Sequence, residues 1–199
     1  MTGISAFIYS DSYRGYNFSP QHPMKPVRLL LTAELIKDYG LLELPNMRIV
    51  EPRPATDVEL RMVHGQDYID KVRELSDPSV EETYAPGWGL GTGDNPVFPD
   101  MHEASATIAG GAIEAVRLIM DGEIDHAFHV GGGLHHAQRE RASGFCIYND
   151  VALAAAWLKK NRDARVLYLD FDAHHGDGVQ QAFYDDPGVM TVSFHESGM

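Results

Sequence analysis

A short stretch rich in acid and histidine, DFDAHHGDG at residues 170–178, directly follows the apolar run RVLYL. It places three carboxylates and two imidazoles at the end of a strand that the apolar run predicts to be buried. Buried charges are costly unless they are paired or bound to a metal. The stretch is therefore a solvated turn, a group of ion pairs, or a functional site.

Asp172 and His174, within this stretch, have the spacing of a cation site. Residues i and i+2 of an extended chain share a face, so both side chains can point into one cavity, with Asp170 one layer deeper. A carboxylate and an imidazole suit Zn²⁺, and suit Fe²⁺ or Mn²⁺ less selectively. Two ligands do not complete a catalytic zinc site, which has three. A helix-capping turn with surface carboxylates explains most isolated pairs of this kind.

A second stretch with chemical potential, GGGLHHAQRERASGFCIYND at 131–150, follows another predicted strand. His135 and His136 are adjacent, so an extended chain separates them, whereas a turn can aim both at one pocket. Histidines suit acid–base catalysis near neutral pH when each is held by a carboxylate. Taken alone, the pair is as well explained by two surface histidines. Asp170 and Asp177 of the first stretch are spare carboxylates that could pair with them, and this coincidence favours a site.

The elements predicted around these stretches alternate between strands and helices. We expect strands at 5–10, 126–130, 165–170 and 189–194, and helices at 27–39, 57–75 (as one or two), 101–120 and 151–160. Asn149 or Asp150 is expected to cap the last helix, and a loop rich in Gly and Pro spans 82–99. Such alternation indicates βαβ units and a parallel sheet, in which ligands bind beyond the carboxyl ends of the strands.

The composition is that of one globular domain, residues 1–199. It is 44% hydrophobic and 23% charged, with no apolar run long enough for a membrane span and no basic start typical of a signal peptide. The single cysteine, Cys146, excludes an internal disulfide and is interpreted as a packing residue. Together these features lead us to expect a protein located in the cytoplasm. The net charge of −13 argues against a protein that tracks nucleic-acid phosphates. The histidines interpreted as structural or solvated are His22, His64, His102, His126, His129 and His195.

The segments GGGLHHAQRERASGFCIYNDVALA and RVLYLDFDAHHGDGVQQAFYDDPGVMTVSFH closely resemble the zinc-dependent histone deacetylase family. They are most similar to its bacterial acetoin-utilisation type, and HPMKPVRL and VHGQDYID are also similar to family segments. The resemblance implies a three-layer αβα, arginase-like fold of the α/β class with a parallel sheet. It also implies zinc-dependent hydrolysis of the acetyl amide of acetyl-lysine in proteins.

The resemblance implies a role for each matching residue. Asp172 and His174 match two of three zinc ligands, with Fe²⁺ as an alternative metal. The implied catalytic pairs are His135 with Asp170 and His136 with Asp177; His136 is the general base and then the general acid, and His135 an electrostatic helper. The implied substrate-binding residues are Asp94 at the rim and Gly144 and Phe145 along the acyl-lysine tunnel. The implied ligands of a structural potassium ion are Asp170, Asp172, His174, Ser193 and Phe194.

The chain differs from the family pattern at its end. The family's third zinc ligand, an aspartate, and the tyrosine that stabilises the oxyanion lie downstream of the matching region. We therefore expect these 199 residues to be the N-terminal portion of a longer domain. Separated from the rest, they would bind zinc poorly and catalyse little.

Three other interpretations compete with a protein lysine deacetylase. Acetylpolyamine hydrolases use the same site with a differently shaped entrance, and the motifs do not distinguish that activity from protein deacetylation. A binuclear manganese ureohydrolase is disfavoured, because Gly176 stands where that family has a carboxylate for the second metal. The third is a truncated product that is not an enzyme. The implied partner is an acetylated protein or peptide, with a bacterial acetyl-CoA synthetase as the candidate; neither nucleic acid nor membrane is expected.

Overall fold

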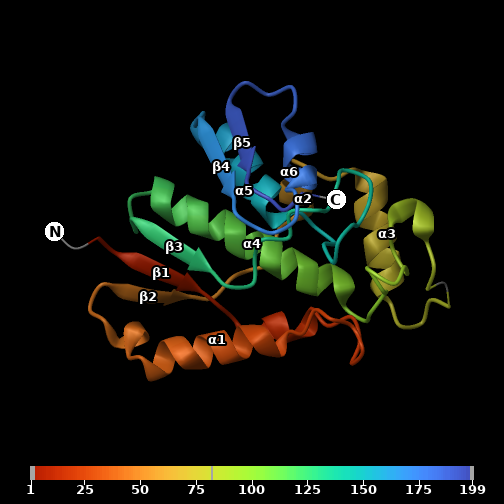
Figure 1. Ribbon diagram of the computed structural model, residues 1–199, viewed down its shortest axis with the longest axis horizontal. Coiled ribbons are helices and arrows are strands. Elements are labelled where there is room, and N and C mark those ends of the chain that lie inside the picture. The colour runs from red at the N-terminus through yellow and green to blue at the C-terminus, as the bar shows by residue number, and fades with distance from the viewer. Residues whose placement is uncertain (1–2, 82, 198–199) are drawn as a thin grey trace.

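The computed structural model describes residues 3–81 and 83–197, and its strands pair in parallel. The strands β2 (Met47–Val50), β1 (Ser5–Ile8) and β3 (His126–His129) form one sheet in that order, and β4 (Val166–Asp170) pairs with β5 (Val189–Ser193) (Figure 1). The predicted α/β class with parallel strands is confirmed. Strand β2 was not predicted, because its four residues are too few to show a period.

Helices connect the strands and cover them. They are α1 (Val27–Asp38), α2 (Asp57–Leu60), α3 (Gln66–Ser76), α4 (Met101–Met120), α5 (Asp150–Arg162) and α6 (Asp177–Ala182). Short 3-10 turns, η1 (Asp11–Gly15), η2 (Leu41–Glu43) and η3 (Pro86–Trp88), lie in the connections. Helix α1 lies along one face of the β2-β1-β3 sheet and α4 along the other, and α5 packs between α4 and β4 (Figure 1).

Helix α4 is central to the core, and its small residues explain how closely its neighbours approach. A Cβ atom on Gly110 would lie 1.8 Å from the Arg53 carbonyl oxygen, and one on Gly111 would lie 2.6 Å from Nε2 of His129. Ile108 and Ile113 are almost completely buried on the same helix. Helix α4 thereby holds β3 and α5, the elements on either side of the 131–150 stretch, in one packed unit.

Strand β4 is less buried than its sequence predicts. Leu167 and Leu169 are 57% and 50% exposed, because α5 packs against one face of this strand and no described segment covers those side chains on the other. The expectation of a fully buried strand at 165–170 is therefore wrong. From residue 83 onward the predicted long loop is confirmed, with η3 as a short turn inside it. Glu82, where that loop was predicted to begin, and residues 198–199 at the chain end lie outside the described residues.

Candidate functional site

The turn after β3 aims both tandem histidines at one place. Gly133 has a φ of +94°, in the region that glycine adopts at little cost, and its carbonyl oxygen accepts a 2.9 Å hydrogen bond from the His135 N–H. The rings of His135 and His136 have centroids 4.1 Å apart. His135 is buried. The interpretation of the two histidines as a surface pair is thus excluded.

Each of these histidines has its own carboxylate. His135 Nδ1 lies 2.6 Å from Asp170 Oδ2, and His136 Nδ1 lies 2.6 Å from Asp177 Oδ1. An ionised carboxylate only accepts hydrogen bonds, so both Nδ1 atoms donate. The two Nε2 atoms are 3.1 Å apart, and a hydrogen bond between them requires one further proton. The two rings can therefore share one proton between their Nε2 atoms.

Asp170, at the end of β4, is held by several donors. The Tyr168 hydroxyl and the Asp172 N–H both donate to its carboxylate, the second at 2.9 Å, in addition to His135. Burial raises the pKa of this carboxyl, but the hydrogen bonds outweigh burial and leave the pKa below its ordinary value. Ionised Asp170 is the form that fits His135. Tyr168 was not predicted as part of the site, although its position two residues before Asp170 puts both on one face of β4.

Asp172 and His174 lie together beyond the end of β4. Asp172 Oδ1 accepts a 2.7 Å hydrogen bond from the His174 N–H and lies 2.9 Å from Nδ1 of its ring. The His174 ring centroid is 5.8 Å from that of His136. Carboxylate oxygens and imidazole nitrogens are common zinc ligands, so the chemistry of these two side chains fits the metal. Over residues 3–81 and 83–197, no three His, Cys, Asp or Glu side chains gather as a metal site, so the described set is one ligand short.

One cavity of 820 Å³ unites most of the predicted site. The predicted residues that line it are His135, His136, Asp170, Asp172, His174, Asp94, Gly144 and Phe145. Asp177 supports His136 from outside the lining. Ser193 and Phe194 also stand outside it: Ser193 pairs with Asp170 in the β4–β5 register, and the Phe194 N–H donates to the Asp170 carbonyl oxygen at 2.9 Å.

The Gly144–Phe145 turn forms part of the cavity wall. A Cβ atom on Gly144 would lie 2.4 Å from Cδ2 of His136, so only glycine lets the backbone pass over that ring. Phe145 has a φ of +69°, which costs energy for a residue with a side chain. The Tyr16 hydroxyl donates to its carbonyl oxygen at 2.7 Å, and His22 packs edge-on at 4.6 Å. Tyr16 and His22 thus hold the turn. Neither of these two contacts was predicted from the sequence.

Cys146 is buried beside this turn and is unsuited to nucleophilic attack. Its Sγ atom lies 3.3 Å from the Gly144 carbonyl oxygen, and burial raises the pKa of the thiol to about 12. The thiolate is the reactive form of cysteine, and a pKa this high leaves almost none at neutral pH. The geometry supports the interpretation of Cys146 as a packing residue.

A buried carboxylate behind the cavity holds the turn that precedes the tandem histidines. Asp150, the first residue of α5, accepts hydrogen bonds from the N–H groups of Gly133 at 3.1 Å and Leu134 at 2.7 Å. His129 Nδ1 lies 3.8 Å from the same carboxylate, and His129 Nε2 lies 2.7 Å from the Tyr13 hydroxyl. Asp150 therefore fixes the backbone directly before His135.

Asn149 holds the same turn from its other side. Its Nδ2 donates to the carbonyl oxygens of His135 and Ala137, each at 3.0 Å, and its side chain also caps α5 as predicted. His64 Nε2 accepts the Asn149 N–H at 3.0 Å, while Nδ1 donates to the Gln138 carbonyl oxygen at 3.0 Å. Only one neutral tautomer of His64 makes both bonds.

We expect His64 to make the fold sensitive to acid. Burial lowers the pKa of His64 to about 4, from about 6.5 in the unfolded chain. The unfolded chain therefore takes up the proton first, so the stability contribution is complete above about pH 6.5 and is lost as the pH falls toward 4. The full difference corresponds to roughly 3 kcal/mol. Urea unfolding at about pH 7, 5.5 and 4.5 measures it.

The control for this prediction is His64→Gln, which cannot take up the proton. Its free energy of unfolding should fall less between pH 7 and 4.5 than that of the wild type. His126→Gln, at an exposed position of β3, should keep the wild-type dependence. His129 and Asp150 also have shifted pKa values, but they are present in all three proteins. Equal slopes for wild type and His64→Gln would contradict the assignment.

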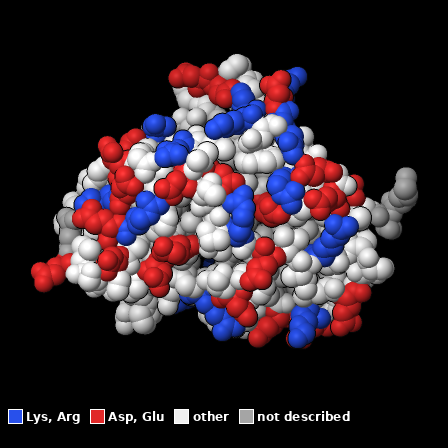
Figure 2. Space-filling view, turned by 180° about the vertical axis from the view of Figure 1, so that it is seen from behind, with Lys and Arg blue, Asp and Glu red and all other residues white. Residues whose placement is uncertain are grey.

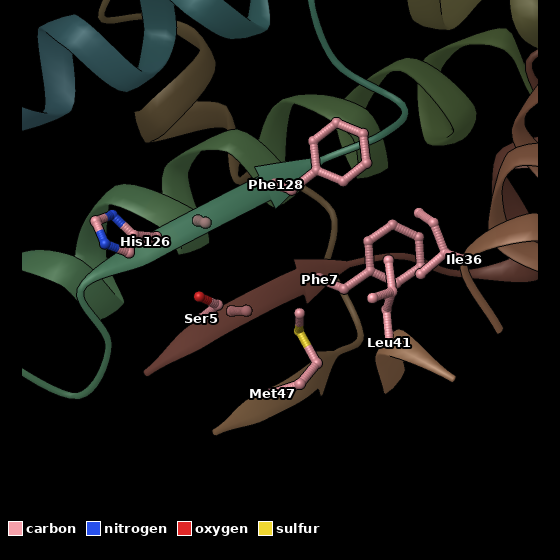
Figure 3. A pocket seen from close by; sticks show the side chains of 9 residues that line it. Ser5, Phe7, Ile36, Leu41, Met47, His126 and Phe128 are labelled. Atoms are coloured by element: carbon pink, nitrogen blue, oxygen red, sulfur yellow. The ribbon is translucent and has the colours of Figure 1, made fainter. Parts of the chain in front are cut away.

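A second hollow, of 260 Å³, lies on the α1 side of the β2-β1-β3 sheet and shares no residue with the cavity. Phe7, Phe128, Ile36, Leu41 and Met47 give it an apolar lining (Figure 3). The titratable side chain in that lining is His126, and none of the described lining residues is a carboxylate. This hollow offers packing surface but no acid–base chemistry.

Charged side chains are intermixed on the face shown in Figure 2. Lys and Arg are scattered among Asp and Glu there and form no continuous stripe of the kind that follows a phosphate backbone. Within the described ranges, no helix is both long enough and apolar enough to cross a membrane.

The chain is similar in sequence to proteins of one family. The Histone deacetylase domain family matches residues 22–199. Acetoin utilization protein AcuC of Bacillus subtilis (strain 168) is 48% identical over 194 residues, which are 98% of this chain and 50% of that protein. AcuC of Staphylococcus xylosus is 42% identical over 198 residues, 100% of this chain and 51% of that protein.

Solved structures show the same likeness. The crystal structure of an HDAC homolog from Aquifex aeolicus has a TM-score of 0.82 at 35% identity and covers 98% of this chain and 51% of its own. That of an HDAC homolog complexed with SAHA has a TM-score of 0.81 at 34% identity, covering 98% and 52%. The predicted arginase-like α/β fold is confirmed. The chain spans about half the length of the curated relatives that it matches.

Proposed function

The chain belongs to the histone deacetylase family, and from this we propose that it carries part of the active site of a metal-dependent protein lysine deacetylase. The reaction is hydrolysis of the acetyl amide of acetyl-lysine. Its C–N bond breaks, a C–O bond to water forms, and acetate and the free lysine amine leave. The observation that carries the proposal is two His–Asp pairs beside Asp172 and His174 at one cavity.

His136 is the proton carrier in this proposal. Its Nδ1 is engaged by Asp177, so Nε2 is the atom that takes a proton from the attacking water. The same atom then gives the proton to the leaving nitrogen, because an amine leaves far more readily than an amide anion. Asp177 fixes the tautomer and stabilises the imidazolium that forms. His135, held by Asp170, keeps a second polar ring against Nε2 of His136 and stabilises the charge there.

Asp172 and His174 are proposed as two zinc ligands, with Fe²⁺ as the alternative metal. The metal, when bound, supplies Lewis acidity that polarises the amide carbonyl and favours ionisation of water. We propose that residues 1–199 are the N-terminal portion of the domain and that the third ligand and an oxyanion-stabilising tyrosine come from outside them. A structural potassium ion is proposed at Asp170, Asp172, His174, Ser193 and Phe194; the pairing of Ser193 with Asp170 supports it.

The proposed substrate is an acetylated protein or peptide whose acyl-lysine side chain enters the 820 Å³ cavity. Phe145 and Gly144 line that path, and Asp94 at its rim offers a carboxylate to backbone N–H groups. The names of the relatives point to acetoin utilisation, and a bacterial acetyl-CoA synthetase is the proposed protein substrate. We propose a cytoplasmic enzyme with no nucleic-acid or membrane partner.

The test measures acetate release by the natural polypeptide, which is the full-length product translated from the gene. We expect it to deacetylate an acetyl-lysine peptide, to lose activity with a chelator and to regain it with zinc. The separate 199-residue chain should show little activity. Faster release from acetylputrescine than from the peptide would assign a polyamine hydrolase instead. No release from either substrate would refute a deacetylase.

A further inference from the structure

A smaller groove of 350 Å³ adjoins the mouth of the cavity. Two loops, 89–95 and 141–144, form its walls. Asp94 and Gly144 line both the groove and the cavity, so the two hollows are continuous at the rim. The remaining wall residues have no part in the hydrolysis described above. The groove therefore lies beside the cavity at these two residues.

The two loops are joined, so the groove has a fixed shape. The Ala142 N–H donates to the Trp88 carbonyl oxygen at 2.9 Å. Gly89 has a φ of +69°, and a Cβ atom there would lie 2.0 Å from the Ala142 carbonyl oxygen. The Arg141 carbonyl oxygen accepts the Gln138 N–H at 2.9 Å. Arg141 is therefore presented from a backbone that is already ordered, which lowers the entropy lost on binding.

Arg141 is the basic side chain of this groove, and the described part of the chain does not neutralise its charge. Across residues 3–81 and 83–197, its guanidinium has neither a hydrogen-bond nor an ion-pair partner. The adjacent Glu140 instead lies 3.3 Å from Arg139. In a chain with a net charge of −13, this leaves a cation exposed at the mouth of the cavity. An unpaired guanidinium is a ready partner for a carboxylate.

The opposite wall offers acceptors. The Asp94 carboxylate is exposed, and its interaction with the chain is through its carbonyl oxygen, 3.2 Å from His22 Nε2. Asn95 is 3% exposed, and its Oδ1 has no donor in the described part of the chain. The Asn95 oxygen is buried, so the groove sets one exposed acceptor, the Asp94 carboxylate, on one loop against a cation on the other. A polypeptide, which carries backbone N–H donors and can carry an acidic side chain, satisfies both.

We propose that this groove binds the polypeptide segment beside the acetyl-lysine and that Arg141 selects substrates with an acidic side chain there. The inference rests on the proposed function and narrows its substrate class. The positions to test are the two on each side of the acetyl-lysine, since two residues extend the chain by roughly 7 Å. Arg141 also repels the ammonium groups of a polyamine, so the groove favours polypeptides over polyamines.

The test compares acetyl-lysine peptides that differ only in having Glu, Gln or Lys at the two positions on each side of the acetyl-lysine. With the natural polypeptide, kcat/KM should be about threefold to fivefold higher for Glu than for Gln, mainly through KM, and the preference should weaken in high salt. Arg141→Ala should remove the preference, and Arg141→Glu should reverse it toward Lys. Arg139→Ala, outside the groove, should leave it unchanged. Equal kcat/KM for all peptides, or a preference unaffected by Arg141→Glu, overturns the inference.

Peptide binding, measured by fluorescence anisotropy, separates this inference from the proposed function. Binding that prefers Glu and depends on Arg141, without any acetate release, would refute the deacetylase and leave the groove assignment intact. Acetate release without an Arg141-dependent preference would refute the groove assignment alone. The absence of both release and binding would refute both.

Discussion

Replacing His136 with alanine is expected to lower kcat for acetyl-lysine hydrolysis by about 10²–10⁴-fold in the natural polypeptide. The reason is that the His136 ring lines the cavity and its Nδ1 is held by Asp177, which leaves Nε2 as the atom that we propose carries a proton between water and the leaving nitrogen. KM should change little, because acyl-lysine binding depends on other walls of the cavity. Steady-state kinetics on an acetyl-lysine peptide give both constants.

Two further variants make this result specific. Asp177→Asn keeps the shape of the carboxyl but weakens the hold on Nδ1, so its loss of kcat should be smaller than that of His136→Ala. His126→Ala removes an exposed histidine of β3 and should keep wild-type kcat. Unchanged kcat in His136→Ala would exclude this ring as the proton carrier.

Replacing Asp150 with alanine is expected to lower the free energy of unfolding by roughly 2–3 kcal/mol. The change leaves the buried N–H of Leu134 without an acceptor and also removes the acceptor of the N–H of Gly133, which is an exposed residue. Part of that loss is offset, because burial raises the pKa of Asp150 to about 6 and its ionised form is costly to bury. Since these N–H groups lie directly before His135, kcat should fall as well. Urea unfolding and peptide kinetics measure the two effects.

Asp150→Asn is the matched control for this prediction. It keeps the volume and one acceptor, so its loss of stability should lie between those of the wild type and Asp150→Ala. Circular dichroism should show the same helix content in all three proteins. A stability of Asp150→Ala equal to that of the wild type would mean that this carboxylate does not hold the turn.

The chemical groups of the site could be predicted from sequence because they lie on local patterns. Asp170, Asp172 and His174 alternate along an extended segment, and both chemically rich stretches follow predicted strands. Parallel strands bring such ends together, which made contacts between the Asp170 and Asp177 carboxylates and the two histidines a reasonable expectation, while the pairing of Asp170 with His135 was implied by the family resemblance. The structure brings these side chains within hydrogen-bonding distance. The roles of these residues in catalysis remain predictions.

The supporting groups could not be predicted, since their partners are distant along the chain. Tyr16 is hydrogen-bonded to Phe145, and His64 to Asn149, although each pair is far apart in the sequence. A local hydrophobic pattern gives no information about such contacts. The exposure of Leu167 was missed for a related reason. An apolar run shows that a strand prefers burial, but burial depends on whether another segment covers both of its faces.

The most direct test measures metal content and acetate release on the same preparation of the natural polypeptide. We predict about one zinc per chain with activity in the wild type, neither in His174→Ala, and zinc without activity in His136→Ala. That pattern would assign metal binding to the Asp172–His174 pair and proton transfer to His136. Full activity in His136→Ala, or zinc content and activity unaffected by His174→Ala, would contradict the account.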